Sequence, residues 1–319
     1  MKPGGTLCVM RARQRAAAFL LGVTADALLG DPPSVMHPVR AIGLVARAYE
    51  GVARGRLRPR TAGIAGALLL PISAGLVATA VEWKSRHRPG GRIVAASGSL
   101  ALASAQRTLM RRALEVADAL DAGNLVEARR LLGYHLVSRP TADLDASEVA
   151  GAAIESVAEN LGDGVAGPWL AFAAGGAGGA WTYRALNTLD SLWGYRTERY
   201  AEFGWAAAHL DDLANLVPAR VAAFAICVAA QRRMKRGVEA FEVWRRDGAL
   251  TDSPNAGQPM AAMAGALGVM LTKRGQYTLG AGLRPADASD IRSAVTVARG
   301  AAVVLAALYL SLIGLRGMR

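Results

Sequence analysis

The sequence predicts an all-helical membrane protein with roughly four to six membrane helices and water-exposed helical loops. The chain is 52% apolar over 319 residues, which is more than an ordinary soluble protein contains. Several uncharged runs approach the length that a helix needs to cross the hydrocarbon core. The sequence has no strand-like alternation, no long repeat and no phosphate-binding glycine loop, so nothing indicates a sheet or a nucleotide-binding α/β fold.

The first expected element is a membrane helix near the N-terminus. Residues 1–15 are basic and residues 16–29 are apolar, a combination that resembles a secretory signal peptide. However, Asp26 interrupts the apolar run, and no cleavage site of small residues precedes residues 30–33. We therefore expect residues 16–29 to be retained as the first helix.

The strongest candidate for a membrane span is the uncharged run 62–81, which has about the twenty residues that a crossing requires. Two further candidates follow at 213–230 and 301–315. Polar residues occupy the first turns of 213–230, so we expect this end to face water or protein. The run 165–180 is a weaker candidate because it contains many glycines.

Residues 98–133 have a different pattern, in which apolar residues recur near helical spacing with charged residues between them. The turn at 121–124 should separate the two helices of a water-exposed hairpin. We interpret this hairpin as a scaffold. The whole chain is expected to form one membrane domain, 1–319, with an N-terminal membrane part (16–92), an amphipathic segment (93–160) and a C-terminal part with polar motifs and membrane helices (161–319).

The net charge of +12 has two common causes, which are nucleic-acid binding and basic flanks on membrane helices. Basic clusters stand at 54–60, 84–92 and 232–236, each beside an apolar run. A nucleic-acid-binding surface would more often interleave such clusters with aromatic residues. We therefore expect the lipid bilayer as a partner and no nucleic acid. The two cysteines, Cys8 and Cys227, are far apart, which argues against a disulfide framework or a zinc site.

Four segments contain polar residues that stability alone does not explain. The first, 30–40, follows the first apolar run and contains three prolines, which favour a rigid, extended loop. Such a loop can present Asp31 to a metal and Arg40 to a phosphate or carboxylate, with His37 between them. The alternative is a turn at the membrane interface with a solvated charge pair.

The second segment, 155–164, begins in an expected helix. Glu155 and Glu159 are four residues apart, so they share a face and repel each other unless a cation lies between them. Mg²⁺ would relieve this repulsion because it prefers carboxylate oxygens. Asn160 and Asp163 extend the same oxygen-rich patch. The alternative is a solvated helix end.

The third segment runs from 184 to 200 and continues at 211–220. Asn187 with Asp190, and Asp211 with Asn215, have helical spacings of three and four residues, which suit an oxygen-coordinated cation. The basic and aromatic candidates for binding phosphate, carboxylate or amide groups are Tyr195, Arg196, Arg199 and Arg220.

The fourth segment, 252–259, is a rigid turn that displays Asn255 between two prolines. A plain helix-entry turn is the alternative for this segment alone. An apolar helix over 260–270 should follow it, too short to span a membrane comfortably.

These segments, in this order, resemble the adenosylcobinamide-phosphate synthase family of cobalamin biosynthesis, the CobD/CbiB family. The resemblance extends from about residue 20 to about residue 271. The matching stretches are 30–33 with 37–40, 155–160 with 163–164, 187–191 with 194–196, 203–204 with 211–212, and 253–257.

The resemblance implies an enzyme of the cell (inner) membrane whose polar motifs face the cytoplasm. It would condense adenosylcobyric acid, a corrinoid, with (R)-1-aminopropan-2-ol or its O-phosphate, using ATP and Mg²⁺. The catalytic candidates are His37, Glu155, Glu159, Asp190 and Asp211. The metal candidates are Glu155, Glu159, Asp163, Asp190, Asp211 and Asp212. The candidates for binding substrate or phosphate are Asp31, Arg40, Asn160, Asn187, Tyr195, Arg196, Arg199, Asn215, Arg220 and Asn255.

Two other functions are compatible with a membrane protein that carries such polar motifs. A transporter would place acidic and basic residues near the middle of its apolar spans, whereas here they cluster at span ends and in loops. A non-catalytic membrane scaffold could use the same acidic clusters to recruit other corrinoid-assembly enzymes.

Overall fold

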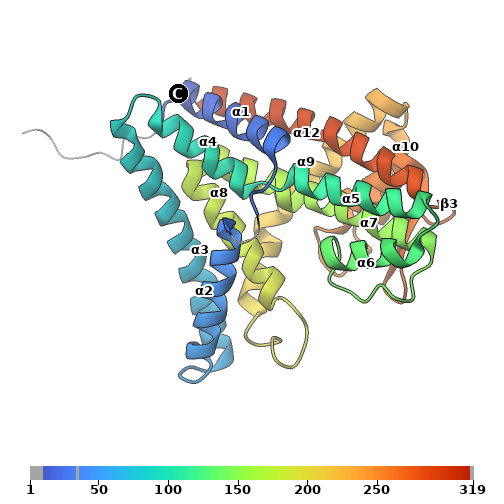
Figure 1. The fold of residues 1–319 in the computed structure, drawn as a ribbon, viewed down its shortest axis with the longest axis horizontal. Coiled ribbons are helices and arrows are strands. Elements are labelled where there is room, and N and C mark those ends of the chain that lie inside the picture. The colour runs from blue at the N-terminus through green and yellow to red at the C-terminus, as the bar shows by residue number, and fades with distance from the viewer. Residues whose placement is uncertain (1–9, 34–35, 317–319) are drawn as a thin grey trace, which may run out of the picture.

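The computed structural model describes residues 10–33 and 36–316, and helices dominate it (Figure 1). The all-helical class is therefore confirmed, while Cys8 lies outside the described residues. The helices of the described chain are α1 (Ala12–Leu29), α2 (Pro38–Ala53), α3 (Pro59–Lys84), α4 (Gly91–Ala103), α5 (Gln106–Asp121), α6 (Leu125–His135), α7 (Ala146–Asn160), α8 (Gly167–Trp193), α9 (Trp205–Met234), α10 (Gly237–Asp247), α11 (Gly257–Leu267) and α12 (Ala288–Arg316).

Three of the described helices are long and apolar enough to cross a membrane, which is fewer than the four to six expected. They are Pro59–His87, Trp205–Met234 and Ala288–Leu315. Helix α1 carries Arg13, Arg15 and Asp26 within its eighteen residues, and such charges are costly in hydrocarbon. Helix α8 contains the glycine-rich run, and its backbone breaks at Gly176, where φ is 64°.

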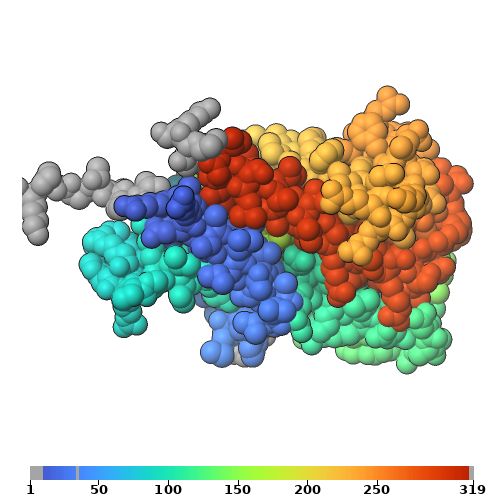
Figure 2. All heavy atoms as spheres, turned by 90° about the horizontal axis from the view of Figure 1, so that it is seen from above, coloured from blue at the N-terminus to red at the C-terminus, as the bar shows by residue number. Residues whose placement is uncertain are grey.

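Small residues let α3 approach α8 closely, as is common between membrane helices. A Cβ atom on Gly75 of α3 would overlap the Thr182 side chain of α8, and one on Gly178 of α8 would overlap the Thr79 side chain of α3. Helices α1, α8 and α12 meet around Phe19, whose ring centroid lies 5.3 Å from that of Trp169 and 6.4 Å from that of Tyr309. Figure 2 shows α12 (red) beside α1 (blue) on one face of the molecule.

The expected amphipathic hairpin is present as α5 and α6. Its turn ends at Asn124, whose side chain caps α6 by accepting a hydrogen bond from the Glu127 backbone N–H at 3.0 Å. Arg292 of α12 donates to Asp118 at 2.7 Å and to Asp121 at 2.6 Å. The polar face of α5 is thus partly used to hold α12.

A small sheet was not expected from the sequence. Its strands are β1 (Val269–Lys273), β2 (Tyr277–Leu279) and β3 (Arg284–Pro285), in the order β2-β1-β3. β1 pairs antiparallel with β2, so that Lys273 lies opposite Tyr277, and it pairs parallel with β3. The sequence showed no sign of these strands, because strands of two to five residues are too short to display an alternating pattern.

Candidate active site

Four predicted acidic side chains converge from different elements. Glu159 is the next-to-last residue of α7, and Asp163 lies in the π-helical stretch Leu161–Ala166. Asp190 lies near the end of α8, and Asp211 lies in the second turn of α9. Asp163 is an electrostatic neighbour of the other three carboxyl groups. We call these four residues the acidic cluster. Single π-helical turns occur frequently at functional sites.

Two predicted asparagines hold Asp211 in place. Asn215 Nδ2 donates to Asp211 Oδ2 at 2.9 Å, and Asn187 Nδ2 approaches Asp211 Oδ1 at 3.5 Å. The Tyr183 hydroxyl in turn donates to Asn215 Oδ1. Asp211 is 7% exposed and Asn215 is 1% exposed, so this network fixes a carboxylate in a largely buried position.

The surroundings of the cluster disfavour ionisation. Burial, and secondarily the nearby Asp212 carboxylate, raise the pKa of Asp190 to about 6. Burial also raises the pKa of Glu159, and burial together with three neighbouring carboxylates holds the pKa of Asp163 well above its usual range. Carboxyl groups with a pKa near neutrality are suited to exchanging protons with a substrate.

Arg184 is a cation beside the acidic cluster, and the sequence indicated no role for it. It lies on α8 close to Asp163, Asp31 and Asp26, and its Nη1 is 3.5 Å from Asn187 Oδ1. Its Nε is buried without a hydrogen-bond partner among the described residues. Its position three residues before Asn187, on the same helical face, was the signal that could have identified it.

The first motif reaches the site only in part. His37 Nε2 lies 3.4 Å from Asp31 Oδ1, while His37 Nδ1 accepts the Val39 backbone N–H at 3.2 Å and so caps α2. Asp31 approaches the cluster through Arg184, whereas Arg40 is exposed on α2. Ser34 and Val35 lie outside the described residues.

The fourth motif packs against the start of α9. Asn255 Nδ2 donates to the Asp212 backbone oxygen at 2.7 Å, and Ser253 Oγ donates to Asp212 Oδ1 at 3.0 Å. Arg220 Nη1 donates to Asn255 Oδ1 at 3.2 Å. The loop therefore fixes this helix, and Asp212 is engaged with it.

The remaining predicted residues have local partners or face solvent. Arg199 Nη2 donates to the buried Glu50 at 2.8 Å, while the exposed Arg196 lies 3.4 Å from Asp252. Asn160 donates to the Ser156 backbone oxygen within α7 at 2.9 Å, and Tyr195 is 46% exposed. The structure does not bring these residues into the acidic cluster.

A polar cavity of about 250 Å³ adjoins the cluster. It lies between the segment 136–139, α7, α11 and the small sheet. Its polar lining includes Arg139, Glu155, Ser156, Glu159, Lys273 and Tyr277. Glu155 and Glu159 share it with cations from the chain itself, since Arg139 Nη2 lies 3.2 Å from Glu155 Oε2 and Lys273 neighbours both glutamates.

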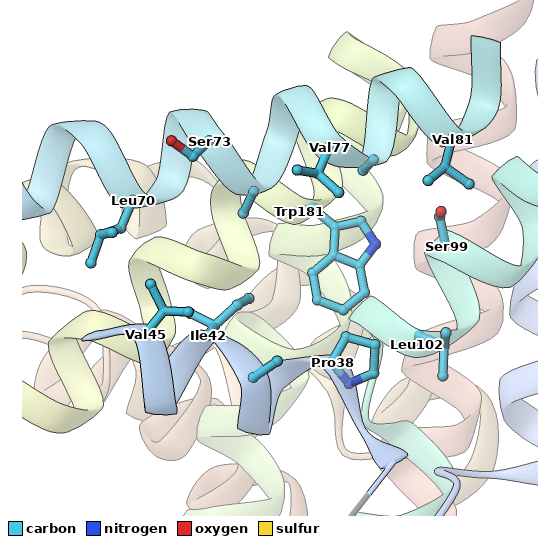
Figure 3. A pocket seen from close by; sticks show the side chains of 13 residues that line it. Pro38, Ile42, Val45, Leu70, Ser73, Val77, Val81, Ser99, Leu102 and Trp181 are labelled. Atoms are coloured by element: carbon cyan, nitrogen blue, oxygen red, sulfur yellow. The ribbon is translucent and has the colours of Figure 1, made fainter. Parts of the chain in front are cut away.

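A second, larger cavity of about 480 Å³ is almost entirely apolar. Figure 3 shows Trp181 of α8 pointing into it, with α2, α3 and α4 around it. Ser73 and Ser99 are the hydroxyl-bearing residues of its lining, which contains no charged side chain.

Comparisons with known proteins identify the family of this chain. The family model described as CobD/Cbib protein matches residues 19–298. The chain is similar to the cobalamin biosynthesis protein CobD of Geobacter metallireducens, with 42% identity over 92% of this chain and 95% of that protein. The CobD proteins of Chromobacterium violaceum and Mycobacterium tuberculosis are 38% and 40% identical, over 92% and 91% of this chain and 97% and 94% of theirs.

No solved structure matches the chain significantly. The family match covers most of the chain, including the acidic cluster and the polar cavity. The chain therefore belongs to the CobD/CbiB family of cobalamin biosynthesis.

Proposed function

We propose that this protein joins adenosylcobyric acid to (R)-1-aminopropan-2-ol or its O-phosphate through an amide bond, with ATP and Mg²⁺. The observation that carries the proposal is the convergence of four carboxylates and Arg184 beside a cavity that holds both acidic and basic groups. A non-catalytic scaffold has no need for carboxyl groups whose pKa is shifted toward neutrality.

Amide formation sets two chemical requirements. The ammonium group of the amine must lose a proton before its nitrogen can attack the carboxyl carbon, and a C–O bond of that carboxyl group must break as the C–N bond forms. Glu159 of the acidic cluster and Glu155 are the proposed proton acceptors, because burial raises the pKa of both carboxyl groups, that of Glu155 to about 7. His37, which caps α2, is the less favoured base.

ATP would supply the activation that a free carboxylate lacks in water, because transfer of its terminal phosphoryl group to a carboxylate oxygen would let that oxygen leave as inorganic phosphate when the C–N bond forms. Arg184 offers a guanidinium group for a phosphate or carboxylate next to the cluster. Asn187 and Asn215 act by holding Asp211 in one orientation. In this proposal the acidic cluster and Arg184 bind and orient the charged groups of the substrates. The membrane helices hold together the helices that carry the cluster.

The acidic cluster fits one kind of Mg²⁺ site. Among the described residues, no group of three or more histidine, cysteine, aspartate or glutamate side chains could hold a metal ion. Mg²⁺ commonly binds through one or two carboxylates, several waters and the phosphates of its substrate. We assign this role to Asp190 and Asp211, which are electrostatic neighbours. Mg²⁺ bound there would neutralise phosphate charge.

The decisive experiment is a turnover assay with the purified protein in detergent. Adenosylcobyric acid, the amine or its phosphate, ATP and Mg²⁺ are supplied, and the product is identified by mass. We expect the condensed amide, and no amide when ATP or Mg²⁺ is omitted. Intact corrinoid binding without any product would overturn the proposal.

We further propose that the protein lies in the cell (inner) membrane with its polar motifs in the cytoplasm, where ATP is available. Reporter fusions should place the segments 136–145 and 248–256 on the cytoplasmic side. An external position for both segments would contradict this orientation.

A further inference from the structure

Another cavity, of about 380 Å³, is lined by three arginines and by no acidic side chain. Arg107 and Arg111 come from α5, and Arg299 comes from α12. We call this cavity the basic pocket. The sequence indicated only a scaffold role for the hairpin that contains α5, so this gathering of charge is a feature that the proposed reaction does not use.

The basic pocket lies at one end of the contact between α5 and α12. Arg292 and Arg299 are seven residues apart on α12, so they lie on nearly the same face of that helix, about two turns from each other. Arg292 binds two carboxylates of α5, Asp118 at 2.7 Å and Asp121 at 2.6 Å. The α5 side chains that share the pocket with Arg299 are arginines instead. One end of this contact is therefore neutralised within the protein, and the other end is not.

Few groups of the protein offset the positive charge of the basic pocket. Within the part of the chain that the structure describes, no carboxylate lies within 4.0 Å of Arg107 or Arg299. Arg111 lies 3.9 Å from Glu115, whose carboxylate is closer to Arg112, at 2.7 Å. Like charges around one space repel unless an anion lies between them. Because guanidinium groups bind phosphate through paired, charge-assisted hydrogen bonds, a phosphate group suits this pocket.

A second observation at the pocket indicates a ligand with a hydroxyl group. Gln106 lines the pocket and is 9% exposed. Its Oε1 is buried without a hydrogen-bond partner among the described residues. A buried acceptor without a donor is costly, and a hydroxyl group of a bound molecule would satisfy it.

The place of the pocket in the fold indicates that this molecule is a lipid. Residues 301–315, directly after Arg299, carry no charge and belong to a helix that is long and apolar enough to cross a membrane. Arg299 therefore marks where α12 would enter the hydrocarbon. Arg107 donates to the backbone oxygen of Leu28 at the end of α1, where Leu28 and Leu29 are 65% and 80% exposed. Phosphate-binding side chains thus stand beside exposed apolar ones, on the face where α1 and α12 lie side by side (Figure 2).

We propose that the basic pocket binds the headgroup of an anionic phospholipid that carries a hydroxyl group, such as phosphatidylglycerol. The three arginines bind its phosphate, Gln106 accepts its hydroxyl group, and its acyl chains lie in the bilayer along α12 and the end of α1. A volume of about 380 Å³ is near the lower end of the range for small-molecule pockets, which is room for the headgroup and not for two acyl chains. Basic pockets beside membrane helices bind anionic headgroups by the same electrostatics. The inference does not depend on the proposed reaction, because none of these side chains belongs to the acidic cluster.

The test is a binding measurement on the purified protein in detergent. Isothermal titration calorimetry would compare dihexanoyl-phosphatidylglycerol with dihexanoyl-phosphatidylcholine, which has the same acyl chains and a phosphate but no net charge. We expect the anionic lipid to bind at least about tenfold more tightly, because several arginines attract it. Dihexanoyl-phosphatidylmethanol, which keeps the charge but has no headgroup hydroxyl, should bind about threefold to tenfold more weakly than phosphatidylglycerol, the loss expected for one neutral hydrogen bond.

Variants of Arg299 test the pocket itself. Arg299→Met should weaken binding of phosphatidylglycerol about 10- to 100-fold, in line with the loss of one charge-assisted contact. Arg245→Met, a matched change at an exposed arginine of α10, should leave that affinity unaltered. Arg299→Lys keeps the charge without the forked donors and should retain more affinity than Arg299→Met. The thermal midpoint of each variant without lipid would reveal a folding defect.

Three outcomes would contradict the inference. Equal affinity of the unaltered protein for phosphatidylglycerol and phosphatidylcholine, or equal losses in Arg299→Met and Arg245→Met, would overturn it. Equal affinity for phosphatidylmethanol would overturn the part assigned to Gln106. Displacement of phosphatidylglycerol by an equal concentration of inorganic phosphate or ATP would assign the pocket to a soluble phosphate and overturn its assignment to a lipid.

Discussion

The apolar and the polar cavity, two of those in the described part of the chain, differ in volume, in lining and in the elements that surround them. The apolar cavity, about 480 Å³, is surrounded by α2, α3, α4 and α8, whereas the polar cavity, about 250 Å³, is bounded by a loop, α7, α11 and the small sheet. They lie toward opposite sides of the molecule, with α2 and α3 at one side and α6, α7 and the sheet at the other (Figure 1).

The larger cavity is lined by apolar side chains of long helices, whereas the smaller cavity carries the ionisable side chains that chemistry requires. The membrane-length helix α3 contributes apolar side chains along one face of the larger cavity. The ionisable groups of the smaller cavity come instead from short elements between long helices. Cavity size is therefore a poor guide to the reactive site in a membrane protein, since apolar space between helices that face lipid needs no functional role.

The largest expected effect is the loss of carboxylates in the acidic cluster. Glu159→Gln and Asp190→Asn should each lower kcat/KM for amide formation by at least about 100-fold, because the first removes a proposed general base and the second a proposed ligand of Mg²⁺. Purified variants would be compared at equal folded amounts. Asp143→Asn, at an exposed carboxylate in the loop before α7, should have no effect. Unchanged turnover in both cluster variants would show that the assignment is wrong.

The carboxyl groups of the site should also determine how kcat/KM depends on pH. Burial raises the pKa of Glu155 to about 7, and a base acts only when it is deprotonated. We expect kcat/KM to rise from about pH 5 to about pH 7.5, falling roughly tenfold per unit on the acidic side when one base is titrated.

Stability should depend on pH in the opposite direction. The folded protein binds more protons than the unfolded chain between the usual carboxyl pKa and the raised one, so folding is favoured at the acidic end of this window and less so as pH rises. In the pH profile of kcat/KM, Glu155→Gln should flatten the part near pH 7. A pH profile of kcat/KM that does not change in this variant would exclude Glu155 as the titrating group.

A smaller effect is expected from the positioning network. Tyr183→Phe removes the hydroxyl that holds Asn215, and through it Asp211. We expect kcat to fall about threefold to tenfold, in proportion to the loss of one neutral hydrogen bond, with little change in KM. Tyr134→Phe, at a tyrosine that is 78% exposed, is the control. An increase in KM alone would indicate a direct role in binding substrate.

The smallest effect on catalysis should come from the apolar cavity. Ala74→Leu would place a larger side chain in that space and should leave kcat/KM within about twofold of the unaltered protein, because there is room for the added atoms. Gly75→Leu on the same helix would collide with Thr182 of α8 and should lower the thermal midpoint. A strong loss of turnover in a stably folded Ala74→Leu protein would assign the apolar cavity a part in the reaction.

The composition and the uncharged runs were sufficient to predict the helical class and three long apolar helices. These features are local, because a helix shows its apolar length directly in consecutive residues. The carboxylates of the acidic cluster were also found from the sequence, since polar residues beside apolar runs are conspicuous. Helices α1 and α8 fall outside the three candidates that qualify by length and composition among the described residues, and they carry charges and glycines, respectively.

Only the tertiary structure decided which of these residues meet. More than a hundred positions separate Arg139 from Lys273 in the sequence, yet both line one cavity together with Glu155. The two strands that carry Lys273 and Tyr277 are too short to produce an alternating pattern. Arg199 resembled a ligand-binding arginine in the sequence, but in the structure it is held by the buried Glu50. Sequence periodicity reports the environment of single helices, and the convergence of side chains depends on how those helices pack.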